Sequence, residues 1–171
     1  MYADDTQFLD AEIPSNLHVL KTRVESSLSA ALTWFTQNRL KINATKMEMI
    51  ILSSRRQVSK ADMSVQFGND VIFPTESVKV LGVVIDQHLT WTSHITLIVQ
   101  RCYCVLVCLA RNRHKLPKCV RRLLVESLVF PHIRYCITVW GSCTAAQRRR
   151  VQKAINFGVR IVNGLMVCVT M

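Results

Sequence analysis

Glycine and proline are scarce in this chain, with five and four copies among 171 residues, and only 19% of the residues are charged. Apolar residues make up 50% of the chain. This composition excludes a disordered, collagen-like or linker-rich protein. It is typical of one globular domain, or of two small ones, with a buried core.

The chain also lacks the cysteine patterns of secreted or zinc-binding proteins. Its seven cysteines are odd in number, include no Cys-x-x-Cys pair, and follow an N-terminus without the basic region of a secretory signal. We therefore expect reduced thiols, no disulfides, and a cytoplasmic or nuclear location. Cys104 and Cys108 share a helix face and could hold zinc with His114, but small buried thiols on an apolar helix are far commoner.

Long apolar runs are missing as well. The longest strongly apolar stretches, Val80 to Ile85 and Cys102 to Ala110, are much too short to cross a bilayer. No membrane-spanning segment is therefore expected.

Acidic residues are nearly absent from the last part of the chain. Residues 1–100 carry 9 Lys and Arg against 10 Asp and Glu, whereas residues 101–171 carry 13 against Glu126 alone. Clustered positive side chains repel one another unless a negatively charged partner offsets them, so a polyanion is expected to bind this part of the chain. The candidates are nucleic acid and an acidic membrane surface.

The front of the chain has the pattern of a mixed α and β domain. The apolar period predicts one helix from Pro14-Ser15 to Asn38, with Trp34 and Phe35 in the core. A turn at Asp4-Asp5 leads into a predicted strand, and further strands follow the helix. The strand before the helix is Thr6–Leu9. The strands after it are Met47–Leu52, a hairpin of Val65–Phe67 and Val71–Phe73, and Val78–Asp86. Within the last of these, Gly82 indicates a bulge or a close backbone approach.

From Thr92 onward the pattern predicts helices. One helix runs to Leu116-Pro117, a second from Pro117 to Phe130, and a last one carries Val151 to Val162 on its apolar face. The segment from Pro131 to Gly141 is ambiguous, although Trp140 is expected in the core. Basic residues lie opposite the apolar faces of the first and last helices: Arg101, Arg111, Lys115, Arg149, Lys153 and Arg160.

Adjacent carboxylates at a hairpin tip have a use in phosphoryl transfer. Hard oxygen ligands hold Mg²⁺, and two such ions clamp the attacking and leaving oxygens of an in-line displacement. An isolated Asp-Asp pair is usually only a solvated turn. The residues around Asp4-Asp5 therefore decide how the pair is interpreted.

Tyr2-Ala3-Asp4-Asp5-Thr6-Gln7-Phe8 resembles the Tyr-x-Asp-Asp motif of reverse transcriptases, particularly those of non-LTR (LINE-like) retrotransposons. Leu40-Lys41-Ile42-Asn43 with Lys46 is similar to the next palm motif of that family, and the segment 78–86 looks like its primer-grip hairpin. The later segments resemble the thumb of these elements: Leu89-Thr90-Trp91, His94-Ile95, and Tyr135 with Val139-Trp140-Gly141. The ordered matches cover nearly the whole chain.

The resemblance implies roles for individual residues on the palm side. Asp4 and Asp5 would be catalytic and would bind two Mg²⁺ ions, and Lys46 would give a proton to departing pyrophosphate. Lys46 is alternatively an ordinary solvated lysine.

Other residues would contact nucleic acid. Lys79 and Gly82 would touch the primer backbone, although a plain edge strand also explains them. Tyr2 and the basic helix faces would contact the template-primer duplex. A merely solvated amphipathic face is the alternative for those helices.

The expected architecture is α+β: a truncated ferredoxin-like palm in residues 1–90, a split βαβ remnant with hairpins, and an all-helical basic thumb in residues 91–171. The implied function is that of a fragment of an RNA-directed DNA polymerase, whose complete relative extends a DNA primer on an RNA template with dNTPs. Fingers and a further palm aspartate would lie upstream of Met1, so the chain is predicted to be inactive alone. Alternatives are a non-enzymatic nucleic-acid-binding remnant and a basic membrane-surface or partner-binding helical module.

Overall fold

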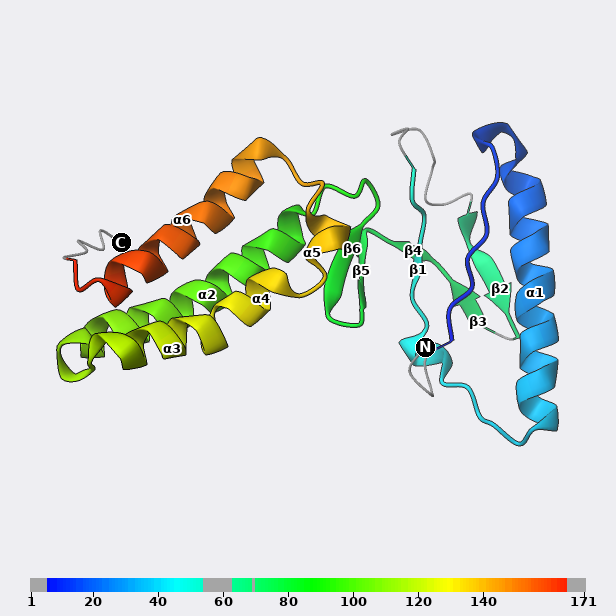
Figure 1. The fold of residues 1–171 in the computed structure, drawn as a ribbon. Coiled ribbons are helices and arrows are strands. Elements are labelled where there is room, and N and C mark those ends of the chain that lie inside the picture. The colour runs from blue at the N-terminus through cyan, green and yellow to red at the C-terminus, as the bar shows by residue number, and fades with distance from the viewer. Residues whose placement is uncertain (1–5, 54–62, 69, 166–171) are drawn as a thin grey trace. The chain divides into compact units, whose positions relative to one another are not determined.

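The computed structural model describes residues 6–53, 63–68 and 70–165 (Figure 1). The chain divides into two compact units, Met1–Val78 (unit 1) and Lys79–Met171 (unit 2). Helices predominate, and the strands of the described part form three sheets of two strands each. The expected mixture of helices and strands is therefore confirmed.

The long helix of unit 1 is α1, Leu17–Gln37, preceded by the short 3-10 helix η1, Pro14–Asn16. The apolar period predicted this helix, and its apolar stripe packs through Leu28 against Val65 and Phe67. The prediction for Trp34 is wrong, because this side chain is 55% exposed. It lies off the stripe that carries Leu28, so the helix turns it toward solvent.

Short strands pair beside α1 (Figure 1). They are β1 (Met49–Ile50) with β4 (Pro74–Thr75), which run parallel, and β2 (Val65–Phe67) with β3 (Asp70–Ile72), which run antiparallel. The predicted hairpin is thus confirmed, with Gly68 at φ +58° in its turn. The predicted strand at 47–52 is reduced to two residues.

The predicted strand Thr6–Leu9 is wrong, since these residues form no regular structure. Leu9 is 93% exposed and Phe8 49% exposed, so neither side chain is buried against a sheet. Within the described part of the chain the segment has no strand to pair with. Without a neighbouring strand, the backbone N–H and C=O groups of this segment can hydrogen-bond to water instead.

The prediction of one strand over Val78–Asp86 is also wrong. Two strands, β5 (Ser77–Val80) and β6 (Val83–Asp86), pair with each other as a hairpin. Leu81 and Gly82 connect them with φ values of +46° and +87°. Two successive residues at positive φ make the tight turn that a two-residue hairpin requires.

Unit 2 is a bundle in which α2, α3 and α6 pack against one another (Figure 1). Its helices are α2 (Thr92–Asn112), η4 (Arg113–Lys115), α3 (Lys118–Leu128), α4 (Phe130–Arg134), α5 (Ile137–Trp140) and α6 (Ala145–Val162). The predicted long helices are confirmed, and α4 and α5 occupy the ambiguous segment. Trp140 is buried, as expected.

Close packing at the centre of this bundle depends on one small residue. A Cβ atom added to Gly158 of α6 would lie 3.2 Å from Val125 Cγ1 and 3.4 Å from Leu106 Cδ2. In the same core Ile95, Leu106 and Ile161 are fully buried. Helix α6 can therefore pack closely against α2 and α3 because Gly158 has no side chain.

Helix α2 with η4 forms a helical segment, Thr92–Lys115, of 24 residues with a hydropathy of 1.6 in its most apolar window. By length and composition alone it could cross a membrane. A central helix of a bundle meets the same two criteria. Here the helix buries seven side chains, among them Ile95, Cys102 and Leu106, against its neighbours in unit 2.

Candidate functional site

The residues predicted at the front of the chain fall in two groups. Tyr2, Asp4 and Asp5 lie outside the described residues. Lys46 ends the 3-10 helix η2, Ala44–Lys46, where its side chain is exposed and its N–H donates to the carbonyl of Asn43 at 3.1 Å. Among residues 6–53, 63–68 and 70–165, no group of three or more His, Cys, Asp or Glu side chains is placed to hold a metal ion.

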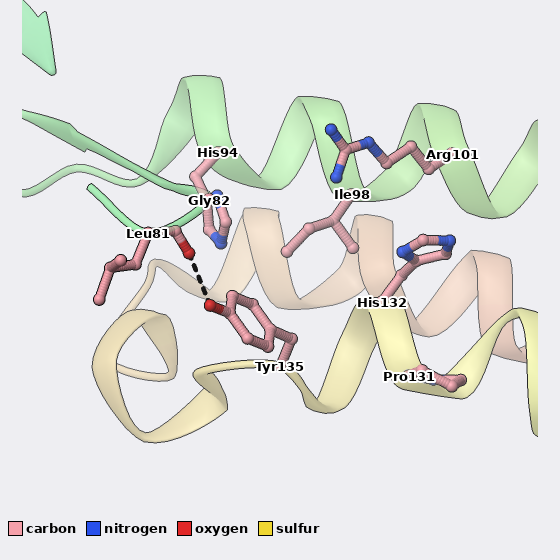
Figure 2. Close-up of a pocket in the computed structure, with 8 residues that line it drawn as sticks. All are labelled: Leu81, Gly82, His94, Ile98, Arg101, Pro131, His132 and Tyr135. Carbon is pink, nitrogen blue, oxygen red and sulfur yellow. Dashed lines mark hydrogen bonds between the residues drawn. The ribbon is translucent and has the colours of Figure 1, made fainter. Parts of the chain in front are cut away.

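The β5–β6 turn is held by a side chain far along the sequence. The Tyr135 hydroxyl donates to the Leu81 carbonyl at 2.6 Å, which ties the turn to the segment after α4 (Figure 2). Gly82 stands beside the tyrosine ring, and a Cβ there would lie 3.7 Å from it. Because φ is positive at Gly82, any side chain at this position would strain the backbone.

Asp86 fixes the path from this hairpin into α2. Its carboxylate accepts backbone N–H groups of His88 at 3.2 Å, Thr90 at 2.9 Å and Trp91 at 2.8 Å. Partial burial raises the pKa of Asp86, but these hydrogen bonds outweigh it, so the net pKa lies below its usual value. The charged carboxylate thereby stabilises a loop in which Leu89 and Trp91 both have positive φ.

His94, in the first turn of α2, connects that helix to the hairpin. Its exposed fraction is 4%, and its Nδ1 accepts the backbone N–H of Val84 at 3.4 Å. The ring meets Trp140 edge to face with 6.2 Å between centroids. Burial, and secondarily the charge of Arg101, lowers the pKa of His94, so the ring is neutral at pH 7.

A pocket of about 410 Å³ opens between the turn, α2 and α4 (Figure 2). Arg101 extends along α2 toward His94, while Tyr135 and His132 face them from the α4 side. Two predicted residues, Gly82 and Arg101, thus line one pocket. Its full lining is Leu81, Gly82, His94, Ile98, Arg101, Pro131, His132 and Tyr135.

The other predicted residues of unit 2 lie on helix surfaces. Arg149, Lys153 and Arg160 are exposed on one face of α6, which we call the α6 basic face. Arg111 and Lys115 are exposed at the C-terminal end of α2 and in η4. Lys79 is exposed on β5. None of these residues lines the pocket that holds Gly82 and Arg101.

Cysteines contribute no cross-link to this arrangement. The six described cysteines, Cys102, Cys104, Cys108, Cys119, Cys136 and Cys143, are all free thiols. Burial raises the pKa of Cys102 to about 11. This thiol belongs to the core of unit 2.

Sequence reasoning missed most of the pocket. His132 belonged to no motif, and His94 and Tyr135 were noted only as part of the family resemblance. A signal for the turn was present, since Leu81-Gly82 lies between two apolar stretches. No sequence signal brings residues 81 and 135 together, because their contact depends on the packing of α4.

Comparison with known protein families, with characterised proteins and with solved structures finds no match to any of them. Function must therefore be inferred from the residues and the geometry described above.

Proposed function

We propose that the chain is a piece of an RNA-directed DNA polymerase of the non-LTR retrotransposon kind. Residues 1–90 would be the back of its ferredoxin-like palm and residues 91–171 its basic thumb. In this role unit 2 holds the RNA/DNA template-primer duplex. In the complete enzyme, Asp4 and Asp5 would hold Mg²⁺, which would supply charge stabilisation during nucleotidyl transfer from dNTPs. Both aspartates lie outside the described residues.

The observation that carries the proposal is the uncompensated charge of unit 2. Glu126, the sole acidic side chain after position 100, is paired with Arg122 at 2.8 Å. The α6 basic face consequently projects its cations into solvent with no carboxylate of the same stretch left to offset them. Lys and Arg on a helix surface bind phosphates without sequence preference and release counterions as they do so.

The β5–β6 hairpin supports the same role. Lys79 is exposed on β5, and the turn at Gly82 presents a stretch of backbone without a side chain. Backbone N–H groups and a nearby lysine are common contacts for nucleic-acid phosphates. This hairpin is the part of the chain that the family resemblance assigns to the primer.

Binding alone is enough to explain the charge, so a second candidate function is a nucleic-acid-binding module without catalysis. The basic surface requires a polyanion but no metal and no reacting group. Anionic membrane lipid would also satisfy a basic helix face. Binding and primer-extension experiments distinguish these candidate functions.

The binding experiment uses the full chain and a labelled RNA/DNA hybrid, titrated over a range of salt concentrations. We expect affinity to fall steeply with salt. Removing Arg149, Lys153 and Arg160 together, each by substitution with Gln, should lower the slope of log K against log salt by about two to three, near 0.9 per phosphate contact. Hybrid binding that is absent, or equal at low and high salt, would overturn the proposal.

A matched control removes the same charge from unit 1. The substitutions are Lys21→Gln, Arg39→Gln and Lys41→Gln, all at solvent-accessible positions. This variant should keep a slope close to that of the unaltered chain, because the duplex lies on unit 2. Anionic vesicles competing fully with the hybrid would favour the membrane-surface candidate instead.

A further inference from the structure

Among the described residues of unit 2, two buried side-chain nitrogens, His94 Nε2 and Arg121 Nε, have no hydrogen-bond partner. The Nε2 atom of His94 is buried and makes no hydrogen bond with any described residue. Because Nδ1 accepts from Val84, the neutral ring carries its proton on Nε2. The unpaired atom is therefore an N–H donor that lacks an acceptor, and leaving such a donor buried and unsatisfied is costly.

The pocket beside this donor is cationic. Arg101 and His132 line it with His94, and no acidic residue does. Within residues 6–53, 63–68 and 70–165, neither Arg101 nor His132 forms an ion pair. Figure 2 shows the guanidinium of Arg101 extending toward His94, with His132 on the opposite wall. The walls thus present donors and no carboxylate.

We propose that this pocket binds a phosphoryl group, with Arg101 and the Nε2–H of His94 donating to its oxygens. A phosphoryl group offers several acceptor oxygens in a tetrahedral array, which suits the two donors of α2, with His132 of α4 on the facing wall. An arginine fork is the usual side chain for such a group. The volume of about 410 Å³ leaves room for an attached sugar or base.

Two sources would present this chemistry. One is a backbone phosphodiester of bound nucleic acid, in which case the pocket is part of the proposed duplex site. The other is a free phosphate ester, which requires no duplex. The shared chemistry is the phosphoryl oxygen, and the experiment has one arm for each source.

The experiment follows the ring ¹⁵N and ¹H signals of His94 and His132 in the full chain. One arm adds inorganic phosphate and the other adds RNA/DNA hybrid. Phosphate should shift both rings in a saturable manner, and Arg101→Gln should weaken phosphate binding about tenfold or more, the usual effect of losing one hydrogen bond to a charged group. Arg148→Gln, an exposed position on α6, removes the same charge outside the pocket and should leave phosphate binding nearly unchanged.

Each outcome separates this inference from the proposed function. Shifts in both arms support a backbone phosphodiester as the ligand, and shifts with phosphate alone support a free ester. Hybrid binding without any shift of His94 in either arm would overturn the phosphoryl pocket while leaving the proposed function intact. Equal weakening by Arg101→Gln and Arg148→Gln would also overturn it, because the effect would then be that of general charge.

Discussion

At the scale of single residues, His94 has a polar contact that depends on its charge state. Nδ1 accepts the N–H of Val84 only when the ring is neutral, and protonation would turn this acceptor into a donor. The surroundings already favour the neutral form, because burial and the charge of Arg101 lower the pKa of His94. The link between α2 and the β5–β6 hairpin should therefore weaken in acid.

The sign of the pH effect follows from linkage. A histidine with a folded pKa below its ordinary value of 6.5 binds fewer protons when folded, so unfolding takes up a proton. The His94 contribution to the free energy of unfolding should be complete above pH 6.5 and should decline as pH falls through the folded pKa. Denaturant unfolding followed by tryptophan fluorescence across this range measures it. His94→Gln should flatten the dependence, and an unchanged slope in that variant would contradict the assignment.

Cys102 offers a second test at this scale. Its pKa of about 11, raised by burial, leaves about one thiol in a thousand ionised at pH 8, and the thiolate is the reactive form. We expect a maleimide to label exposed Cys104, Cys108 and Cys119 rapidly and Cys102 slowly in the folded chain. In denaturant the rates should converge. Labelling of Cys102 as fast as Cys104 under native conditions would show that unit 2 is packed differently.

At the scale of elements, α6 begins with a complete capping box. The Thr144 hydroxyl accepts the N–H of Gln147 at 3.4 Å, and the Gln147 side chain accepts the N–H of Thr144 at 3.1 Å. Gln147 also donates to the Thr92 hydroxyl at 2.7 Å, which joins the N-terminal ends of α6 and α2. Both helices thus start from one hydrogen-bonded cluster.

Loss of this cap should destabilise the chain by a known order of magnitude. Thr144→Ala should lower the free energy of unfolding by about 1 kcal/mol, the usual effect at an N-cap. Thr144→Ser keeps the hydroxyl and serves as the matched control. Equilibrium denaturation measures both, and equal stability of the Ala and Ser variants would show that the box contributes nothing.

Helices of this protein were predictable because their apolar period extends over many turns. The stripes through Leu28 in α1, Ile95 in α2 and Ala154 in α6 were sufficient to assign the helices. The strands of two to four residues were harder to predict: the β2–β3 hairpin was found from its turn residues, but 78–86 was taken for one strand because apolar residues continue through its turn. Trp34 was wrongly predicted in the core because the sequence does not distinguish an aromatic residue beside the apolar stripe from one within it.

The candidate site was predictable only in part, for a related reason. Gly82 and Arg101 were selected from family resemblance and charge, yet the pocket they share depends on His94 and on Tyr135. Tyr135 is 54 positions from the carbonyl that it binds. A contact of that range is set by the packing of helices, which local sequence patterns do not encode.

At the scale of the whole molecule, the two units differ in core and in charge. Unit 2 has a continuous core of buried side chains from Val83 to Ile161, whereas the cluster under α1 consists of Leu28, Val65 and Phe67 with half-buried neighbours. The excess of positive charge belongs entirely to unit 2, because acidic residues slightly outnumber basic ones in unit 1. Under the proposed function, the basic unit would be the thumb that binds the duplex, and Asp4-Asp5 would belong to the palm that carries out the reaction.

Catalysis by the 171-residue chain on its own is not expected. Under the proposed function, Asp4 and Asp5 would need a bridging aspartate and a nucleotide pocket beside them, because positioning supplies most of the rate of such an enzyme. Joining the chain to the fingers and front palm of a non-LTR reverse transcriptase should restore both. The chimera therefore tests whether these carboxylates are catalytic.

The most direct measurement is Mg²⁺-dependent primer extension on poly(rA)/oligo(dT) by the chain, the chimera and the chimera carrying Asp4→Asn. The proposed function predicts no extension by the chain alone, extension by the chimera, and a loss of at least about 100-fold on Asp4→Asn while hybrid affinity is unchanged. Robust extension by the chain alone, or an Asp4→Asn chimera as active as its parent, would contradict it.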